Sequence, residues 1–312
     1  MMDYRTDLAM ERTVYPGGLG EGVAVQTQHK GSAEITWVRI ETPRAAERLG
    51  KAEGTYWTMT HPELPCLDPE ERMDVARQVA QVLRLMLPPK GDVLVLGLGN
   101  RRMTADALGD RVVSGILVTR HMKEMLSSAP WETDRSEQDD TKQLRSVCAM
   151  SPGVLGITGV ETAELAMGLV ERLRPSAVVV VDALAAMETD HIGTTIQLTD
   201  TGIRPGSGVG NHRAAITKDV LQVPVIAIGI PMVVYASTIV RDALKHILAS
   251  ESSAEAAHEM AEQLTGGICG DMVVTPRNID ELVAGLADML ALAVNSALQP
   301  AYTIDELSHY LH

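Results

Sequence analysis

The segment that most constrains the fold is residues 92–110, DVLVLGLGNRRMTADALGD. Its apolar residues 93–96 are too few for a helix and include β-branched side chains, which predicts a buried strand. The glycine-containing turn that follows ends this strand, and Thr104 is expected to cap a short helix that ends near Gly109. A strand, a glycine turn and a helix in this order place the turn at the carboxyl edge of a sheet, where open α/β folds bind ligands.

The glycine turn does not fit a dinucleotide-binding site. In that fingerprint a third glycine lets the helix pack closely on the strand, but Arg102 stands at this position. The fingerprint also needs an acidic residue about 20 residues further on, and this chain has Thr119, Arg120 and His121 there. The spacing therefore disfavours a dinucleotide cofactor. A non-catalytic nucleotide- or ligand-binding module remains as an alternative.

Two aspartates lie near the carboxyl ends of two predicted strands. Asp106 is on the short helix after the glycine turn, and Asp182 directly follows the apolar strand predicted for residues 177–181. Taken singly, Asp106 would have a structural role in its helix, and Asp182 would cap the turn after its strand. Because strands of a parallel sheet end at one edge, the two carboxylates can also share one crevice. The pair is therefore a candidate catalytic site.

Composition and charge exclude several classes of protein. The chain has 312 residues, 45% of them hydrophobic, which is enough for a sizeable core in one or two domains. A net charge of −14 disfavours direct nucleic-acid binding, which needs a basic surface. The three cysteines include no CxxC pair and are expected to be reduced thiols. The N-terminus has no signal-peptide core and no apolar run reaches membrane-spanning length, so we expect a cytoplasmic protein that does not bind a membrane.

Strands alternate with helices along the chain, which predicts an α/β fold with a mainly parallel sheet and flanking helices. A β-hairpin is expected at residues 23–40, before a helix that starts at Asp68 with an N-cap, a proline and two acidic residues. Further strands are expected at residues 112–119 and 223–230, and the longest helix at residues 276–298.

The chain is expected to consist of an N-terminal arm, residues 1–20, and a single α/β domain, residues 21–312. Within that domain, residues 126–146 are polar and acidic and are expected to form an exposed excursion. Residues 194–213 contain four glycines and a proline close together, which excludes a helix from that part. This segment is predicted to be a loop whose backbone N–H groups lie over an active crevice; a plain surface loop is the alternative.

A set of short motifs extends over residues 4–211, about two thirds of the chain. The motifs are YRTDLA from Tyr4, GLGN from Gly97, TADALG from Thr104, MSPGVLG from Met150, VDAL from Val181, TIQLTDTG from Thr195 and PGSGVGN from Pro205. With these motifs the sequence resembles the spore germination protease family, endopeptidases that degrade small acid-soluble spore proteins when a bacterial spore germinates. The long glycine-rich motif is the most specific of the set.

The resemblance implies an α/β fold similar to hydrogenase maturation endopeptidases, a homotetramer in the cytoplasm of the spore core, and a zymogen that trims its own N-terminus. It also implies that two aspartates are essential, which the motifs place at Asp106 and Asp182. We expect no cofactor. In the related maturation enzymes the equivalent acids and a histidine hold a metal. A metal-dependent peptidase that uses His191 or His212 in addition therefore remains as an alternative.

Paired carboxylates can hydrolyse an amide bond if they share one proton. Two unit charges about 4 Å apart repel each other by about 4 kcal/mol at an effective dielectric constant near 20, or about three pKa units. One acid would stay protonated and act as general acid while the other activates water, and the sequence leaves open which is which. The glycine loop is a candidate source of oxyanion donors and substrate contacts, at Gly206, Ser207, Gly208, Gly210 and Asn211.

Residues 1–7 are a candidate pro-segment. Asp7 is followed by the large apolar residue Leu8, then by alanine, and Glu11 follows two places later. Substrates of the family are cut at a similar pattern, between the acid and the large apolar residue. A segment without periodicity can enter a peptidase cleft as an extended strand. We therefore expect self-cleavage between Asp7 and Leu8; the alternative is an ordinary polar arm with one buried leucine.

Overall fold

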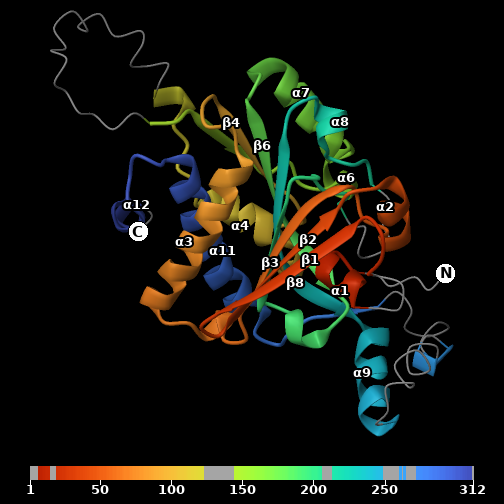
Figure 1. Ribbon diagram of the computed structural model, residues 1–312. Helices are drawn as coiled ribbons and strands as arrows, with labels where there is room; N and C mark the ends of the chain where they lie inside the picture. The colour runs from red at the N-terminus through yellow and green to blue at the C-terminus, as the bar shows by residue number, and fades with distance from the viewer. Residues whose placement is uncertain are drawn as a thin grey trace, which may run out of the picture.

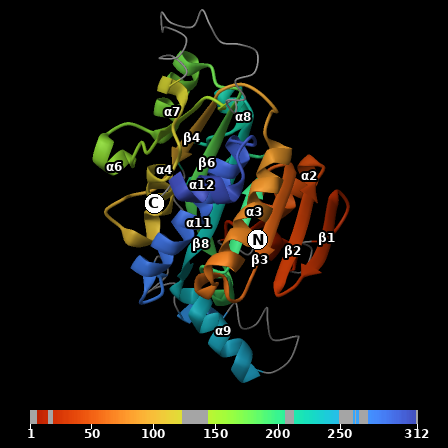
Figure 2. The ribbon, with the colours of Figure 1, turned by 90° about the vertical axis from the view of Figure 1, so that its left-hand side faces the viewer.

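The computed structural model describes residues 6–14, 19–122, 144–205, 213–248, 260–261, 263–264 and 272–310. Within these residues, one β-sheet runs through the centre of the molecule and helices pack against its faces (Figures 1 and 2). Its strands are β1 (Val23–Lys30), β2 (Ala33–Ile40), β3 (Gly54–Thr60), β4 (Val93–Gly97), β5 (Val147–Met150), β6 (Ala177–Ala186), β7 (Thr195–Thr199), β8 (Val225–Tyr235) and β9 (Val273–Val274).

The sheet has a parallel part and an antiparallel part, in the order β1-β2-β3-β7-β8-β6-β4-β5, with β9 paired to β8. Strands β8, β6, β4 and β5 are parallel to one another. Strand β7 pairs antiparallel with β8 and connects it, through β3, to the hairpin of β1 and β2. The α/β fold class and the N-terminal hairpin are thereby confirmed. The sheet is mixed and not mainly parallel as expected: three strand pairings are parallel and five are antiparallel among the described residues, because β3, β7 and β9 extend the antiparallel part beyond the hairpin.

Helices cover the two faces of the sheet unequally. The cores contain α3 (Pro69–Met86), α4 (Leu108–Ser114) and α11 (Ile279–Leu298) on one face and α7 (Thr162–Leu173) on the other. By length and hydropathy α11 could span a membrane, but its apolar window is 72% buried in the protein, as in a core helix. The remaining helices are α1 (Ala9–Thr13), α2 (Pro43–Leu49), α6 (Leu155–Thr158), α8 (Lys218–Leu221), α9 (Ala236–Leu248) and α12 (Ile304–Tyr310), and 3₁₀ turns lie at Leu64–Cys66, Thr104–Asp106 and Thr189–His191.

Side chains of the central strands alternate between the two faces, as the strand period of two requires. In β6, Val181 packs in the core that contains α3 and α11, so the next residue, Asp182, faces the opposite side of the sheet. In β7, Ile196 and Leu198 belong to the same core, so Gln197 also faces the opposite side. The sheet therefore presents Asp182 and Gln197 on one face.

Residues 112–119 do not form the expected strand. Helix α4 takes up the first part of this segment, with Leu108 and Val112 one turn apart and both fully buried. Thr104 begins a 3₁₀ turn and not the helix that was expected to end near Gly109. A short apolar run fits a buried helix as well as a strand, and the packing of α4 against α11 decides between them.

Strands β6 and β8 are longer than the sequence predicts. The expected ends lie before Asp182 and at Pro231, but both strands continue for several residues beyond these points. Proline has no N–H to donate to the hydrogen bonds between strands. Pro231 pairs with Leu184, and the register shifts between Leu184 and Ala185. Pairing resumes beyond this irregularity, as across a β-bulge. Asp182 consequently lies within β6 and not at its exit.

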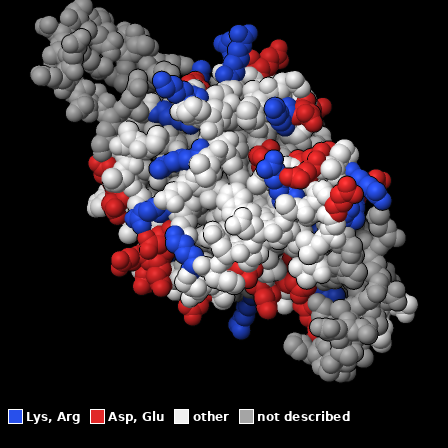
Figure 3. All heavy atoms as spheres, in the orientation of Figure 1, with Lys and Arg blue, Asp and Glu red and all other residues white. Residues whose placement is uncertain are grey.

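Some expectations fall on residues outside the described ranges. These include most of the pro-segment, residues 1–5, and nearly all of the acidic excursion, residues 126–143. The division into an arm and a single domain stays a prediction. On the face shown in Figure 3, the described basic and acidic side chains are interspersed around a largely uncharged central area. That distribution differs from the basic stripe of a nucleic-acid-binding face.

The start of α3 offers a test of the local structure. Asp68 Oδ1 accepts the Glu71 N–H at 2.9 Å, and the Glu71 carboxylate accepts the Asp68 N–H at 3.2 Å, which forms a capping box. We predict that Asp68→Ala lowers the free energy of unfolding by about 1 kcal/mol, measured by urea denaturation. Asp68→Asn should lower it less because the amide oxygen still accepts the bond. Equal stability of the alanine variant and the wild type would contradict the prediction.

Candidate active site

Asp106 is positioned by the glycine turn after β4. Gly99 has a φ of +100°, and a Cβ there would lie 1.9 Å from the Asp106 carbonyl oxygen, so the turn requires glycine. Asp106 ends the 3₁₀ turn, and its Oδ2 accepts the Asn100 N–H at 2.8 Å. Burial raises the pKa of Asp106, while the Asn100 N–H and the charge of Arg213 act in the opposite direction.

Asp182 interrupts a run of buried apolar residues in β6. Only 6% of it is exposed, and its Oδ1 accepts the N–H of the following residue, Ala183, at 2.9 Å. Burial raises the pKa of Asp182 well above its ordinary value, and the charges of Asp106 and Asp7 raise it further. The Ala183 N–H and Arg213 oppose this rise. Asp182 therefore keeps its proton to a higher pH than a solvated aspartate does.

The two aspartates line one pocket of about 300 Å³. The Leu98 N–H donates to the Val181 carbonyl oxygen at 2.8 Å, which holds the glycine turn of Asp106 against the strand of Asp182. Arg213 also lines this pocket and places a positive charge near both acids. The structure thus brings together the two carboxylates that the sequence analysis had paired, and it gives both of them a raised pKa.

The N-terminal arm reaches the same pocket. The Asp7 N–H donates to the Ala185 carbonyl oxygen at 2.9 Å, and the Ala185 N–H donates to Asp7 Oδ2 at 2.9 Å, so the arm lies along the end of β6. Leu8 is fully buried in a small apolar cluster formed with β6 and β8. Asp7 lines the pocket of the two aspartates. The expected processing site is therefore next to the candidate catalytic pair.

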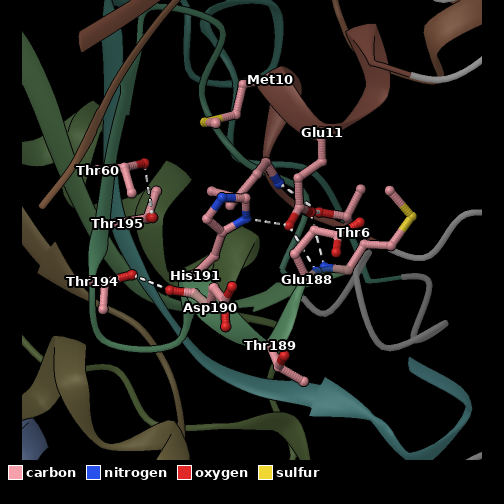
Figure 4. A network of polar contacts seen from close by, with 12 residues as sticks. Thr6, Met10, Glu11, Thr60, Glu188, Thr189, Asp190, His191, Thr194 and Thr195 are labelled. Carbon is pink, nitrogen blue, oxygen red and sulfur yellow. Dashed lines mark hydrogen bonds and ion pairs between the residues drawn. The ribbon is translucent and has the colours of Figure 1, made fainter. Parts of the chain in front are cut away.

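A buried carboxylate, Glu11, anchors the arm further along (Figure 4). It is 2% exposed and accepts the N–H groups of Met187 at 2.9 Å and Glu188 at 3.0 Å. It also bonds to His191 Nδ1 at 2.6 Å and accepts the hydroxyl hydrogen of Thr6. These contacts attach the arm to the segment after β6. They also give His191 a structural role, which differs from the metal role considered for it.

Two side chains that the sequence analysis did not single out hold the main chain of the arm. Gln197 Nε2 donates to the Asp7 carbonyl oxygen at 3.0 Å, and its Oε1 accepts the Ala9 N–H at 2.8 Å. Lys51 Nζ donates to the Thr6 carbonyl oxygen at 2.9 Å. Burial lowers the pKa of Lys51 to about 8, although the Asp7 charge acts to raise it. In the sequence, a polar glutamine inside the apolar segment TIQLT could have indicated a role for Gln197. Nothing in the sequence near Lys51 indicates its role.

The predicted oxyanion loop, with Gly206, Ser207, Gly208, Gly210 and Asn211, lies outside the described residues, as does His212. The residues on either side of these positions, Pro205 and Arg213, both line the pocket of the aspartates. Within the part of the chain that the structure describes, no group of three or more His, Cys, Asp or Glu side chains is arranged to hold a metal ion.

The His191–Glu11 pair should make stability depend on pH. Burial alone would lower the pKa of His191, but the hydrogen bond and charge of Glu11, with the charges of Glu188 and Asp190, raise it above 6.5. Because the folded-state pKa is raised, the pair stabilises fully below pH 6.5, and this contribution is lost as pH rises through the raised pKa.

We predict that the urea midpoint of the wild type falls over this pH window and that His191→Gln shows a smaller fall. The glutamine keeps a hydrogen-bonding group but cannot take up the proton. A pH series of urea denaturation curves for both proteins measures the difference. Equal falls in the two proteins would show that other groups cause the dependence.

The family profile and the relatives that match this chain agree on one family. A family profile described as Germination protease matches residues 17–262. The germination protease of Caldanaerobacter subterraneus subsp. tengcongensis is 41% identical, over 100% of this chain and 99% of the relative. Those of Clostridium acetobutylicum and Bacillus velezensis are 36% and 32% identical, over 100% and 99% of this chain and 100% and 96% of the relatives.

A solved structure also matches, a NiFe hydrogenase maturation protease from Thermococcus kodakarensis KOD1. It is 19% identical with a TM-score of 0.28, and the match covers 59% of this chain and 97% of that chain. A likeness this weak carries no argument about the site. The family profile and the full-length relatives carry the assignment, and by them the chain belongs to the germination protease family.

Proposed function

We propose that this chain is an endopeptidase zymogen that cuts its own N-terminus and starts the degradation of small acid-soluble spore proteins during germination. Membership of the germination protease family supports a spore germination endopeptidase. The observation that carries the finer proposal is that Asp106, Asp182 and Asp7 line one pocket. In this arrangement a pair of acids adjoins the residue whose peptide bond is expected to be cut.

In the proposed mechanism, Asp182 is the protonated acid and Asp106 is the ionised base. Asp182 is the more deeply buried, and two neighbouring carboxylates add to the effect of burial on its pKa. Asp106 takes a proton from a water molecule, whose oxygen bonds to the carbonyl carbon of Asp7. Asp182 gives its proton to the nitrogen of Leu8, and the carbon–nitrogen bond breaks. One water is consumed, and a carboxylic acid and an amine are formed.

The wider organisation follows the family resemblance. Residues 1–7 are the proposed pro-segment, and residues 21–312 are the proposed peptidase domain, which works without a cofactor as a homotetramer in the cytoplasm of the spore core. The glycine loop at residues 206–211 is the proposed source of oxyanion donors and substrate contacts. The positions of Pro205 and Arg213 in the pocket wall support this role for the segment between them.

We predict that Asp106→Asn and Asp182→Asn fold normally and that each loses activity by about 100-fold or more, because each removes a proton-transfer group. Purified full-length protein is incubated alone and with a small acid-soluble spore protein, and the products are mapped by mass spectrometry. The wild type should lose residues 1–7 and cut the added protein. The exposed Asp219→Asn is the matched control and should behave like the wild type. An active-site variant that cuts near the wild-type rate would remove that residue from the pair.

We also predict that cleavage survives exhaustive chelation, because the proposed pair activates water without a metal. The same incubation is repeated after dialysis against a chelator. The control restores each divalent metal in turn. Activity that disappears on chelation and returns with one metal would replace the aspartate pair by the metal-dependent alternative.

A further inference from the structure

We infer that Gln197 binds the substrate main chain on both sides of the bond to be cut, and that its side-chain N–H stabilises the negative charge that develops on the carbonyl oxygen. The identity of that bond, Asp7–Leu8, rests on the proposed function. In this role Gln197 is a third catalytic residue beside Asp106 and Asp182, and it contributes a donor and an acceptor but no titrating group.

The two polar ends of Gln197 contact the arm on either side of that bond. Nε2 donates to the carbonyl oxygen of Asp7 at 3.0 Å, and Oε1 accepts the N–H of Ala9 at 2.8 Å. Donors that stabilise an oxyanion lie about 2.7–3.1 Å from it, and the Nε2 distance falls in that range. Both contacts are to main-chain atoms, so a substrate of another sequence whose main chain follows the same path can make them as well.

The sheet places Gln197 two strands away from Asp182, and the Leu184 side chain packs over the glycine between them. Gln197 on β7 and Asp182 on β6 both pair in register with Gly229 on β8, so the three residues form one row. With strands about 4.8 Å apart, the α-carbons of Gln197 and Asp182 are about 10 Å apart. Asp7 lines a hollow on each side, one with Gln197 and Gly229 and the other with Asp182. The arm at Asp7 is thus flanked by an amide and a carboxyl group.

The burial of Gln197 fits this role. It is 6% exposed, and the neighbouring residues Ile196 and Leu198 are fully buried in the opposite core. A buried amide that loses its partners costs free energy. Cleavage at Asp7–Leu8 releases the carbonyl that Nε2 binds. The main chain of a new substrate would restore the hydrogen bond that Gln197 Nε2 had lost.

The structure allows docking of the arm to be measured separately from cleavage. Glu11 is held by two N–H groups, His191 and Thr6, and none of these contacts involves Gln197. Leu8 is fully buried. The arm should therefore stay docked when Gln197 is replaced, and resistance of the Arg12–Thr13 bond to added trypsin reports that docking.

The experiment measures the first-order rate of self-cleavage in the full chain by mass spectrometry. Gln197→Met removes both polar atoms at similar length, and Gln197→Glu keeps the acceptor for the Ala9 N–H but not the donor. We expect both variants to cut about 100-fold or more slowly than the wild type, with Arg12 still resistant to trypsin. Gln81→Glu, on the exposed side of α3, is the matched control and should cut at the wild-type rate.

Glu11→Gln is the contrasting variant, and it should make Arg12 sensitive to trypsin because it weakens the anchor. Cleavage by Gln197→Met near the wild-type rate would overturn the inference. Slow cleavage accompanied by loss of trypsin resistance would also overturn it, because docking alone would then explain the effect.

Asp106→Asn separates this inference from the proposed function. If Asp106→Asn is inactive while Gln197→Met cuts normally, only the role of Gln197 is overturned. If Asp106→Asn cuts normally while Gln197→Met is slow and docked, the aspartate pair is overturned and the role of Gln197 stands. Absence of any cut at Asp7–Leu8 in the wild type would overturn both proposals.

Discussion

The burial of one carboxyl group, that of Asp182, is the constraint on which the site depends. Strand β6 is enclosed on both faces, and an ionised group there loses most of its hydration. The raised pKa of Asp182 relieves this cost, because the neutral form is favoured. Asp106 and Asp7 act in the same direction, and Arg213 moderates the effect. An acid that holds its proton near a second, more exposed carboxyl group is the arrangement that general acid–base chemistry needs.

The arm is bound near the pocket and also further along the chain. Asp7 bonds to the main chain of Ala185 through its N–H and its side-chain Oδ2, and the Gln197 side chain bonds to the main chain of Asp7 and Ala9. Leu8 and Glu11 provide the apolar and the charged anchors. Both anchors lie C-terminal to the expected cut between Asp7 and Leu8. Cleavage between Asp7 and Leu8 would leave them attached and would remove one carboxylate that raises the pKa of Asp182.

Local sequence patterns determined several elements and the two candidate acids. The hairpin of β1 and β2, the capped helix α3, the buried strand β4 and the long helix α11 follow from periodicity, capping residues and glycine placement. Asp106 and Asp182 stood out because each is close to the end of an apolar run and both match a family motif. These signals extend over only a few neighbouring residues, so they can be read without knowing what packs against them.

The tertiary structure decided the rest, because the deciding contacts join residues far apart in the chain. Residues 112–114 are helical because α4 packs against α11, and β6 continues past Asp182 because β8 pairs with it. Gln197 reaches the arm only because β7 lies beside β8, with Gly229 between it and β6. The sequence by itself determined which acids to pair. The amide beside them and the buried anchor at Glu11 depend on contacts across more than 170 residues, and no local pattern encodes these.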